Sequence, residues 1–140
     1  MKNIQVLDCT LRDGGRIIDC AFKDNVIREM TEKLINAGID IVEMGFLRDK
    51  QSVNYEGNST FFTSVSQIEP FIPQNCDGKM CVAFIDFHMY DFDDLEPCNG
   101  KSVTGIRVGF TKKQWDAERE ELKRCFLKVK EQGYKLLVQG

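Results

Sequence analysis

Long apolar runs are absent from the sequence: none approaches the roughly 18 residues that a bilayer-spanning helix requires. The N-terminal segment, MKNIQVLDCT, also reaches a charged residue too early for the apolar core of a secretory signal. These two absences favour a cytoplasmic protein without a membrane partner.

Positive charge is not in excess either. The formal net charge is −3 at pH 7 and the sequence pI is about 5.2. Proteins that bind nucleic acid neutralise its phosphates with a basic face, and this composition indicates none. Nucleic acid is therefore not an expected partner.

The spacings typical of zinc-binding motifs are missing. The chain has no Cys-x-x-Cys pair and a single histidine, His88, which excludes zinc fingers and zinc ribbons. The six cysteines are therefore expected to be reduced thiols that act as small core residues. They are Cys9, Cys20, Cys76, Cys81, Cys98 and Cys125.

Apolar segments of strand length recur along the chain. With 42% hydrophobic and 29% charged residues in 140 positions, the composition is that of one folded domain. A run such as IQVLDCT, with polar residues only at its end, is typical of a strand buried on both faces. Five strands are predicted, at residues 4–9, 39–44, 80–86, 105–108 and 134–140.

Two of the connections between these strands carry a helical pattern. In DNVIREMTEKLINAG, apolar residues recur at helical spacing, Asp24 can cap the start and Gly38 can end the helix. In residues 111–132, Thr111 and Gln114 form a capping box. Strand, helix, strand units with short connections favour parallel strands joined by right-handed crossovers.

Residues 48–79 form a long connection of another kind. A polar stretch, RDKQSVNYEGNST, precedes a short helix predicted near residues 62–68, which Pro70 and Pro73 end. Long loops inside compact domains are often lids or binding loops. A later acidic run predicts a solvated helix start with a cap at Asp93. The acidic residues of that run are Asp91, Asp93, Asp94 and Glu96.

The alternation of strands and helices indicates an α/β fold. Two architectures fit it: an open doubly wound sheet, or part of a closed (β/α)8 barrel with its strands in sequential order. No Gly-x-Gly-x-x-Gly motif follows the first strand, which weighs against dinucleotide binding but not against another phosphorylated ligand. No linker divides the chain, so residues 1–140 form one domain of about four and a half β/α units.

Polar side chains stand where the predicted strands end. Parallel strands bring their carboxyl ends to one edge of the sheet, and both architectures place their sites there. We therefore expect the side chains that follow the first, second and fourth strands to converge. These are Arg12, Asp13, Glu43 and Arg107, with Asp86 and His88 at the end of the third strand.

Arg12 and Asp13 together suggest a specific chemistry. Asp13 supplies a hard oxygen ligand for a divalent cation, and the guanidinium of Arg12 can hold an oxyanion. A metal chelated by a 2-oxo acid polarises its carbonyl, while a guanidinium stabilises the enolate oxygen formed when a carbon–carbon bond is made or broken. Gly14 and Gly15 are expected to let the backbone turn sharply behind this pair.

The segment LDCTLRDGG, followed about thirty residues later by IVEMGF, resembles the DRE-TIM metallolyase superfamily. That superfamily includes 4-hydroxy-2-oxovalerate aldolases, isopropylmalate and homocitrate synthases and hydroxymethylglutaryl-CoA lyase. Its Asp-x-Thr-Leu-Arg-Asp-Gly signature is matched from Asp8 to Gly14, and AFIDF and GIRVGF look like its third and fourth barrel strands. The resemblance implies the N-terminal half of an aldolase-type (β/α)8 barrel.

The resemblance also implies roles for individual residues. Arg12 would be the catalytic arginine, Asp13 a ligand of a divalent metal (Mn, Mg, Co or Zn), and Glu43 the acidic catalytic residue of the second strand. Arg16 stands where pyruvate-forming aldolases carry a histidine base, so another base or a more acidic substrate is implied. Arg107 either contacts a substrate carboxylate or forms a structural pair with Glu43 or Asp86. The expected activity is carbon–carbon cleavage or condensation of 2-oxo acids.

A further departure from the family pattern, in addition to Arg16, qualifies that expectation. The family completes its metal site with a His-x-His pair on a late strand, whereas this sequence ends at Gly140 in its fifth strand. His88 is a candidate substitute ligand, although a lone histidine is more often a packed or surface side chain. The chain is therefore expected to be inactive alone, with an exposed strand edge that self-associates or pairs with a missing C-terminal half. The alternative is a noncatalytic α/β domain that binds a carboxylate or a partner chain.

Overall fold

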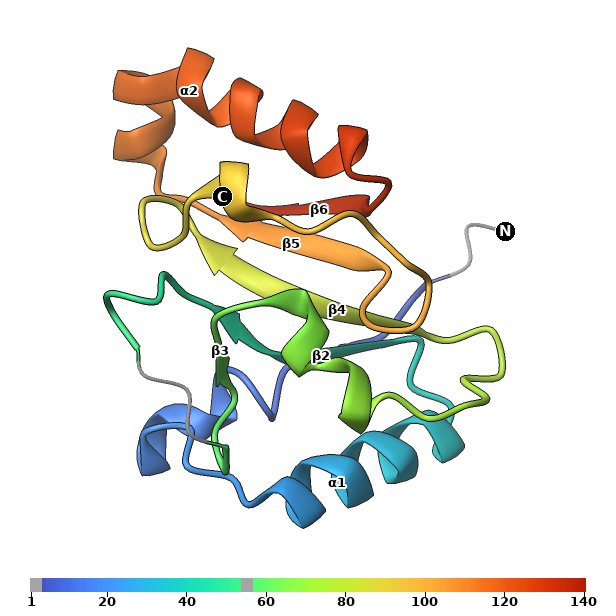
Figure 1. Cartoon of the computed structure of the whole chain (residues 1–140). Coiled ribbons are helices and arrows are strands. Elements are labelled where there is room, and N and C mark those ends of the chain that lie inside the picture. Colours follow the sequence, from blue (N-terminus) through green and yellow to red (C-terminus); the bar gives the residue numbers. More distant parts are fainter. Residues whose placement is uncertain (1–3, 54–56) are drawn as a thin grey trace.

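A computed structural model describes residues 4–53 and 57–140 of the chain. Its strands are all parallel and form one curled, half-barrel sheet in the order β1-β2-β4-β5-β6, with β3 added beside the end of β2 (Figure 1). The predicted sequential order is confirmed. The strands are β1 (Leu7–Asp8), β2 (Ile41–Leu47), β3 (Phe61–Phe62), β4 (Met80–Asp86), β5 (Gly105–Gly109) and β6 (Lys135–Gln139).

Two helices accompany the sheet, α1 (Asp24–Asn36) and α2 (Lys112–Glu131). In Figure 1 they lie at opposite ends of the curled sheet, α1 beside its first strands and α2 beside β6. Neither helix, within the described residues, combines the length and apolarity that a bilayer span requires. The apolar stripes of both helices join the main core: Ile27 and Ile35 of α1 and Leu122, Cys125 and Val129 of α2.

Side-chain alternation gives the sheet one apolar face and one mixed face. Residues of β2, β4 and β5 that point toward the helices belong to the main core, whereas their sequence neighbours point to the inner face of the curled sheet. The core-facing set is Val42, Met44, Cys81, Ala83, Ile85, Ile106 and Val108. The inner face therefore receives the polar strand residues Glu43 and Arg107.

A β-bulge in β2 changes this alternation. Glu43 pairs with Val82 but Phe46 pairs with Phe84, so β2 holds one extra residue at Gly45. Gly45 has φ of +153°, and a Cβ there would lie 2.2 Å from the carbonyl oxygen of Thr60. Beyond the bulge, Phe46 rather than Gly45 shares the inner face with Glu43.

The first strand is shorter than predicted. Only Leu7 and Asp8 pair with β2, and Ile4 is 90% exposed, so the expectation of a strand over residues 4–9 buried on both faces is wrong. Among the described residues β1 is an outer strand with β2 as its one neighbour, so nothing covers its start. The amide of Val6 is held instead by the carboxylate of Asp40, at 2.9 Å.

The helix boundaries follow the prediction except at one cap. Thr111 and Gln114 form the predicted capping box, and Gly38 ends α1 in a left-handed conformation with φ of +87°. Asp24, however, is the first residue of α1 and not its cap, because Lys23 occupies that position. The Asp24 carboxylate accepts the amide of Asn58 at 2.8 Å and so anchors a distant loop.

Two loop predictions need correction. The segment predicted as a helix near residues 62–68 begins with β3 and continues as two 3₁₀ turns, Val65–Gln67 and Glu69–Phe71. Pro70 lies inside the second turn, because a proline near a helix start removes no needed hydrogen bond. In the acidic run the cap is Asp91, which accepts the amide of Asp93. Residues 54–56 of the polar stretch lie outside the described part.

The bulge at Gly45 leads to a stability prediction. Gly45→Ala is expected to lower the free energy of unfolding by more than about 2 kcal/mol, because backbone strain and a clash with Thr60 act together. Gly38→Ala is the control: it shares the positive φ but meets no atom within 4 Å, so about 1 kcal/mol is expected. Urea unfolding measures both, and equal losses would contradict the special role of Gly45.

Candidate functional site

A buried carboxylate joins two arginines from different parts of the sheet. Glu43 on β2 is fully buried, and its Oε1 accepts Nε of Arg12 at 2.5 Å. Its Oε2 accepts Nη1 of Arg107, from β5, at 2.9 Å. Of the two partners predicted for Arg107, the structure selects Glu43 rather than Asp86.

Asp13 extends this network toward solvent. Its Oδ1 accepts Nη1 of Arg12 at 3.0 Å and Nε of Arg16 at 2.9 Å, and its side chain is about half exposed. The structure thus brings together the five residues that were expected to serve catalysis, substrate binding and metal binding, although Glu43 is the third of seven residues in β2 rather than at the end of its strand. His88, the candidate substitute ligand, is bonded to Glu118 instead. We call Arg12, Asp13, Arg16, Glu43 and Arg107 the Glu43 network.

The turn after β1 positions Arg12 and Asp13. The carbonyl of Cys9 accepts the amides of both residues, at 3.1 and 2.8 Å, and the carboxylate of Asp8 accepts the amide and hydroxyl of Thr10. These bonds fold the chain back so that the Arg12 side chain reaches β2. The short polar residues after the apolar Leu7 therefore specify a tight turn.

The two glycines of the motif differ in their roles. Neither has a positive φ, so the expectation that they permit a sharp turn through backbone freedom is wrong. A Cβ at Gly15 would lie 2.8 Å from the Phe22 ring and 3.0 Å from the sulfur of Cys20. Gly15 is needed for close packing, while a Cβ at Gly14 would make only ordinary contact with Thr10.

Aromatic rings form the floor beneath the guanidinium groups. The Arg12 Cζ lies 4.3 Å from the centroid of the Phe84 ring, and that of Arg107 lies 5.6 Å from it. Cation–π attraction adds to the ion pairs at such distances. Gly109 makes room for this ring, because a Cβ there would lie 2.3 Å from Phe84 Cζ.

Arg48 belongs to the same cluster but was not among the candidates. Its Cζ lies 4.6 Å from the Phe46 centroid, and its Nη2 donates to Asp86 Oδ2 at 2.7 Å. The predicted strand ended at residue 44, which placed Arg48 in the long polar connection, whereas β2 continues to Leu47. Strict alternation from Glu43 would in any case direct Arg48 to the opposite face. The glycine in the middle of β2 was the available signal, because glycine inside a strand often marks a bulge.

The cluster carries more positive than negative charge. The ion pair of Arg48 and Asp86 adjoins the Glu43 network across the Phe46 ring. The network and this pair together contain four arginines and three carboxylates. Planar guanidinium groups suit bidentate contacts with carboxylates. The arrangement therefore favours a small anionic ligand.

The described residues do not by themselves make a metal site. They contain no group of three or more His, Cys, Asp or Glu side chains that could hold an ion. Asp13 offers one oxygen, Oδ2, while its Oδ1 contacts two guanidinium groups that repel a cation. His88 contacts Glu118 of α2 at 2.9 Å, not Asp13.

A buried thiol next to the network is not activated. The sulfur of Cys20 donates to the carbonyl oxygen of Arg12 at 3.7 Å. Burial raises the pKa of this thiol, against a smaller opposing effect of its hydrogen bond with Thr60. Because the thiolate is the nucleophilic form, Cys20 is a packing residue rather than a reactive one.

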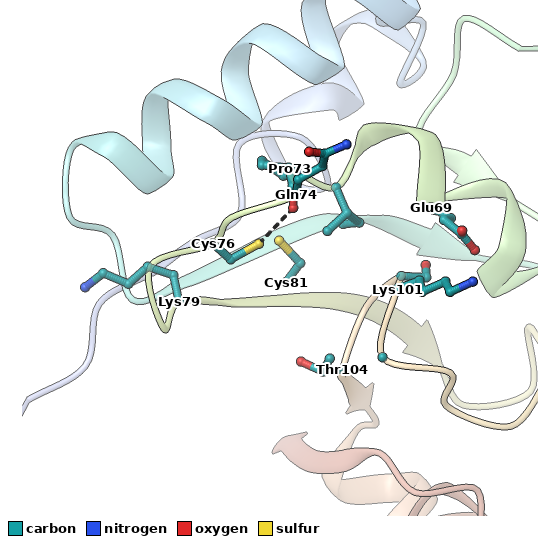
Figure 2. Close-up of a pocket in the computed structure, with 11 residues that line it drawn as sticks. Glu69, Pro73, Gln74, Cys76, Lys79, Cys81, Lys101 and Thr104 are labelled. Carbon is teal, nitrogen blue, oxygen red and sulfur yellow. Dashed lines mark hydrogen bonds between the residues drawn. The ribbon is translucent and has the colours of Figure 1, made fainter.

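Away from the Glu43 network, a cavity of about 620 Å³ lies at the amino-terminal edge of the sheet. Figure 2 shows the sulfurs of Cys76 and Cys81 side by side in it, with Glu69 and Lys101 farther along the wall. Burial raises the pKa of Cys81 to about 12 and also raises that of Cys76. Protonated thiols are weak nucleophiles and metal ligands, so the Glu43 network is the stronger candidate site.

Comparisons with protein-family models, with curated proteins and with solved structures found no match to this chain. A functional assignment therefore depends on the geometry of the Glu43 network and on the sequence motif that contributes Arg12 and Asp13.

The Glu43 network makes a second stability prediction. Glu43→Gln keeps the side-chain shape but leaves the largely buried guanidinium of Arg107 without a carboxylate and that of Arg12 with only Asp13, so we expect a loss of about 3–5 kcal/mol. Glu29→Gln removes an exposed partner of Lys33 and is expected to leave stability nearly unchanged. Chemical unfolding of both variants is the measurement, and similar small losses would contradict a structural role of Glu43.

Proposed function

We propose that the Glu43 network is the 2-oxo acid-binding part of a metal-dependent carbon–carbon lyase or aldolase that acts in the cytoplasm. The supporting observation is that one buried carboxylate holds Arg12 and Arg107 together on the inner face of a half-barrel sheet. The resemblance of LDCTLRDGG to the DRE-TIM metallolyase motif agrees with this proposal.

Both central arginines keep donors for a ligand. Arg12 uses Nε and Nη1 within the network, and Arg107 uses one Nη1, as far as the described residues go. A guanidinium carries five N–H groups, so each arginine retains several. A 2-oxo acid offers a carboxylate and a carbonyl oxygen, which are the acceptors these donors require.

The residues then take distinct roles. Arg12 stabilises the enolate oxygen that develops on C2 when the C3–C4 bond of a 4-hydroxy-2-oxo acid breaks and the aldehyde leaves, while Arg107 and the more exposed Arg16 hold the substrate carboxylate. Both oxygens of Glu43 are occupied by guanidinium groups, so we assign Glu43 a positioning role rather than that of a base. A bound divalent ion would supply Lewis-acid polarisation of the carbonyl.

Asp13 contributes one ligand to that ion in this proposal. Mn, Mg, Co and Zn all accept carboxylate oxygen, but a catalytic metal usually has about three protein ligands. Further ligands in addition to Asp13 are therefore required, as in the His-x-His pair that the family resemblance implies.

The half-barrel is proposed to be the N-terminal part of a (β/α)8 barrel. Its strands run in sequence order, and β6 pairs only with β5 among the described residues. A barrel leaves no strand edge unpaired. The outer edge of β6 would then pair with a further strand, from additional chain or from a second copy.

A second candidate function is noncatalytic carboxylate binding. It is favoured by the lack of a three-ligand metal group among the described residues. Both functions use the same arginines, so ligand binding alone does not separate them. Metal-dependent turnover of a 2-oxo acid would distinguish the lyase from a noncatalytic binding domain.

Oxalate tests the shared binding site, because it resembles the planar enolate of pyruvate. We expect Arg12→Lys to weaken oxalate binding about tenfold in calorimetric titration, since an ammonium group cannot bond Glu43 and Asp13 with one planar fork. Arg28→Lys is the control, because Arg28 is an exposed residue of α1 that contacts the carbonyl of Pro70. Equal affinity of wild type and Arg12→Lys would refute the assignment of Arg12.

Manganese titration tests the metal contribution of Asp13. The 140-residue chain is expected to bind Mn²⁺ with a Kd on the order of 1 mM and to cleave 4-hydroxy-2-oxo acids at a negligible rate, because one carboxylate oxygen holds a divalent ion poorly. Micromolar affinity together with turnover that Asp13→Ala abolishes would show instead that this chain completes a metal site.

A further inference from the structure

Arg48 has an unmet hydrogen-bonding need beside the Glu43 network. Its side chain is about nine-tenths buried, its Nη2 is bonded to Asp86, and its Nη1 is buried without a partner. Nη1 is the one buried side-chain nitrogen or oxygen without a partner in the described part of the chain. A buried donor without a partner is unfavourable, so an acceptor that binds at this position would stabilise the protein.

Arg48 lines a cavity that adjoins the 2-oxo acid site. The cavity has a volume of about 480 Å³ and is also lined by Phe84 and Asp86 of β4 and by Thr111 at the start of α2. Phe84 borders both the cavity and the 2-oxo acid site, because its ring lies under the Arg12 guanidinium and the residue also lines the cavity. We call this space the Arg48 cavity. Its size suits a small-molecule fragment.

The start of α2 forms part of the cavity wall, because Thr111 and Gln114 both line the Arg48 cavity. The hydroxyl of Thr111 accepts the amide of Gln114 and so caps the helix. The backbone departs from helical geometry at Glu118, so the first helical segment, residues 112–117, is too short to add a helix-dipole site for an anion. The attraction of this cavity for an anion therefore depends on Arg48.

The remaining charged groups of the cavity are already paired. Asp86 is bonded through Oδ2 to Arg48, and His88 is bonded to Glu118. Phe87 and Phe110 add apolar surface to a wall that also holds polar side chains. An entering group therefore meets the guanidinium of Arg48, whose Nη1 lacks a partner, as the one charged group of the cavity with an unmet hydrogen bond among the described residues.

Building on the function proposed above, we propose that the Arg48 cavity binds a second carboxylate of the substrate. The substrate class is then a 2-oxo dicarboxylic acid. Its 2-oxo carboxylate contacts the Glu43 network, and its distal carboxylate accepts a hydrogen bond from Nη1 of Arg48. Arg48 is a specificity residue in this arrangement.

A matched pair of probes tests this directly. 2-Oxoglutarate and 2-oxopentanoate have the same chain length and differ in whether the far end is a carboxylate or a methyl group. We expect the chain to bind 2-oxoglutarate about tenfold more tightly in calorimetric titration, as one charge-assisted hydrogen bond would give. Arg48→Met should abolish this preference, whereas Arg28→Met, which removes an exposed charge on α1, should preserve it.

Two further measurements keep the test decisive if Arg48→Met folds poorly. Arg48→Lys retains the charge but loses the planar fork, so we expect a reduced preference. In amide NMR spectra of the wild type, 2-oxoglutarate should shift the amides of Thr111 and Gln114, which line the Arg48 cavity, and 2-oxopentanoate should not. Unchanged preference in Arg48→Lys together with no shift at these amides would overturn the proposal.

The outcomes also separate this inference from the proposed function. Equal affinity for the two probes, weakened for both by Arg12→Lys, would refute the Arg48 cavity as a carboxylate site and leave the Glu43 network as a 2-oxo acid site. Binding that Arg12→Lys does not affect, or no binding of either probe, would refute both.

Discussion

The arrangement of the site depends on one buried carboxylate. Glu43 is fully enclosed, and its charge is offset by guanidinium groups from two other parts of the chain, the turn after β1 and strand β5. Removing water from a carboxylate costs several kcal/mol, which only close pairing with good geometry offsets. Arg12 and Arg107 are therefore held in fixed positions, and their unused donors form a preorganised anion site.

Small residues make this pairing sterically feasible. Gly109 leaves space for the Phe84 ring beneath both guanidinium groups, and Gly45 lets the carbonyl of Thr60 approach β2 closely. The bulge at Gly45 also brings Phe46 and Arg48 to the same side as Glu43. Backbone geometry thus decides which charges meet on the inner face, and the ion pairs then stabilise that geometry.

The sequence allowed the strand order, both helices and the meeting of Arg12, Glu43 and Arg107 to be predicted. The meeting was expected at the carboxyl ends of the strands, whereas Glu43 is the third of seven residues in β2 and meets the arginines on the inner face of the sheet. The sequence did not reveal the short β1, the role of Arg48 or the cap at Asp91. Exposure of β1 depends on which strands lie beside it, and the direction of Arg48 depends on a bulge. Both are long-range or backbone effects that local patterns do not encode.

The most direct test of the central claim is a crystal structure of the chain grown with oxalate. We predict oxalate between the free donors of Arg12 and Arg107, with both guanidinium groups still bonded to Glu43. Oxalate bound elsewhere, or Glu43 separated from either arginine in the complex, would contradict the view that this carboxylate preorganises a 2-oxo acid site.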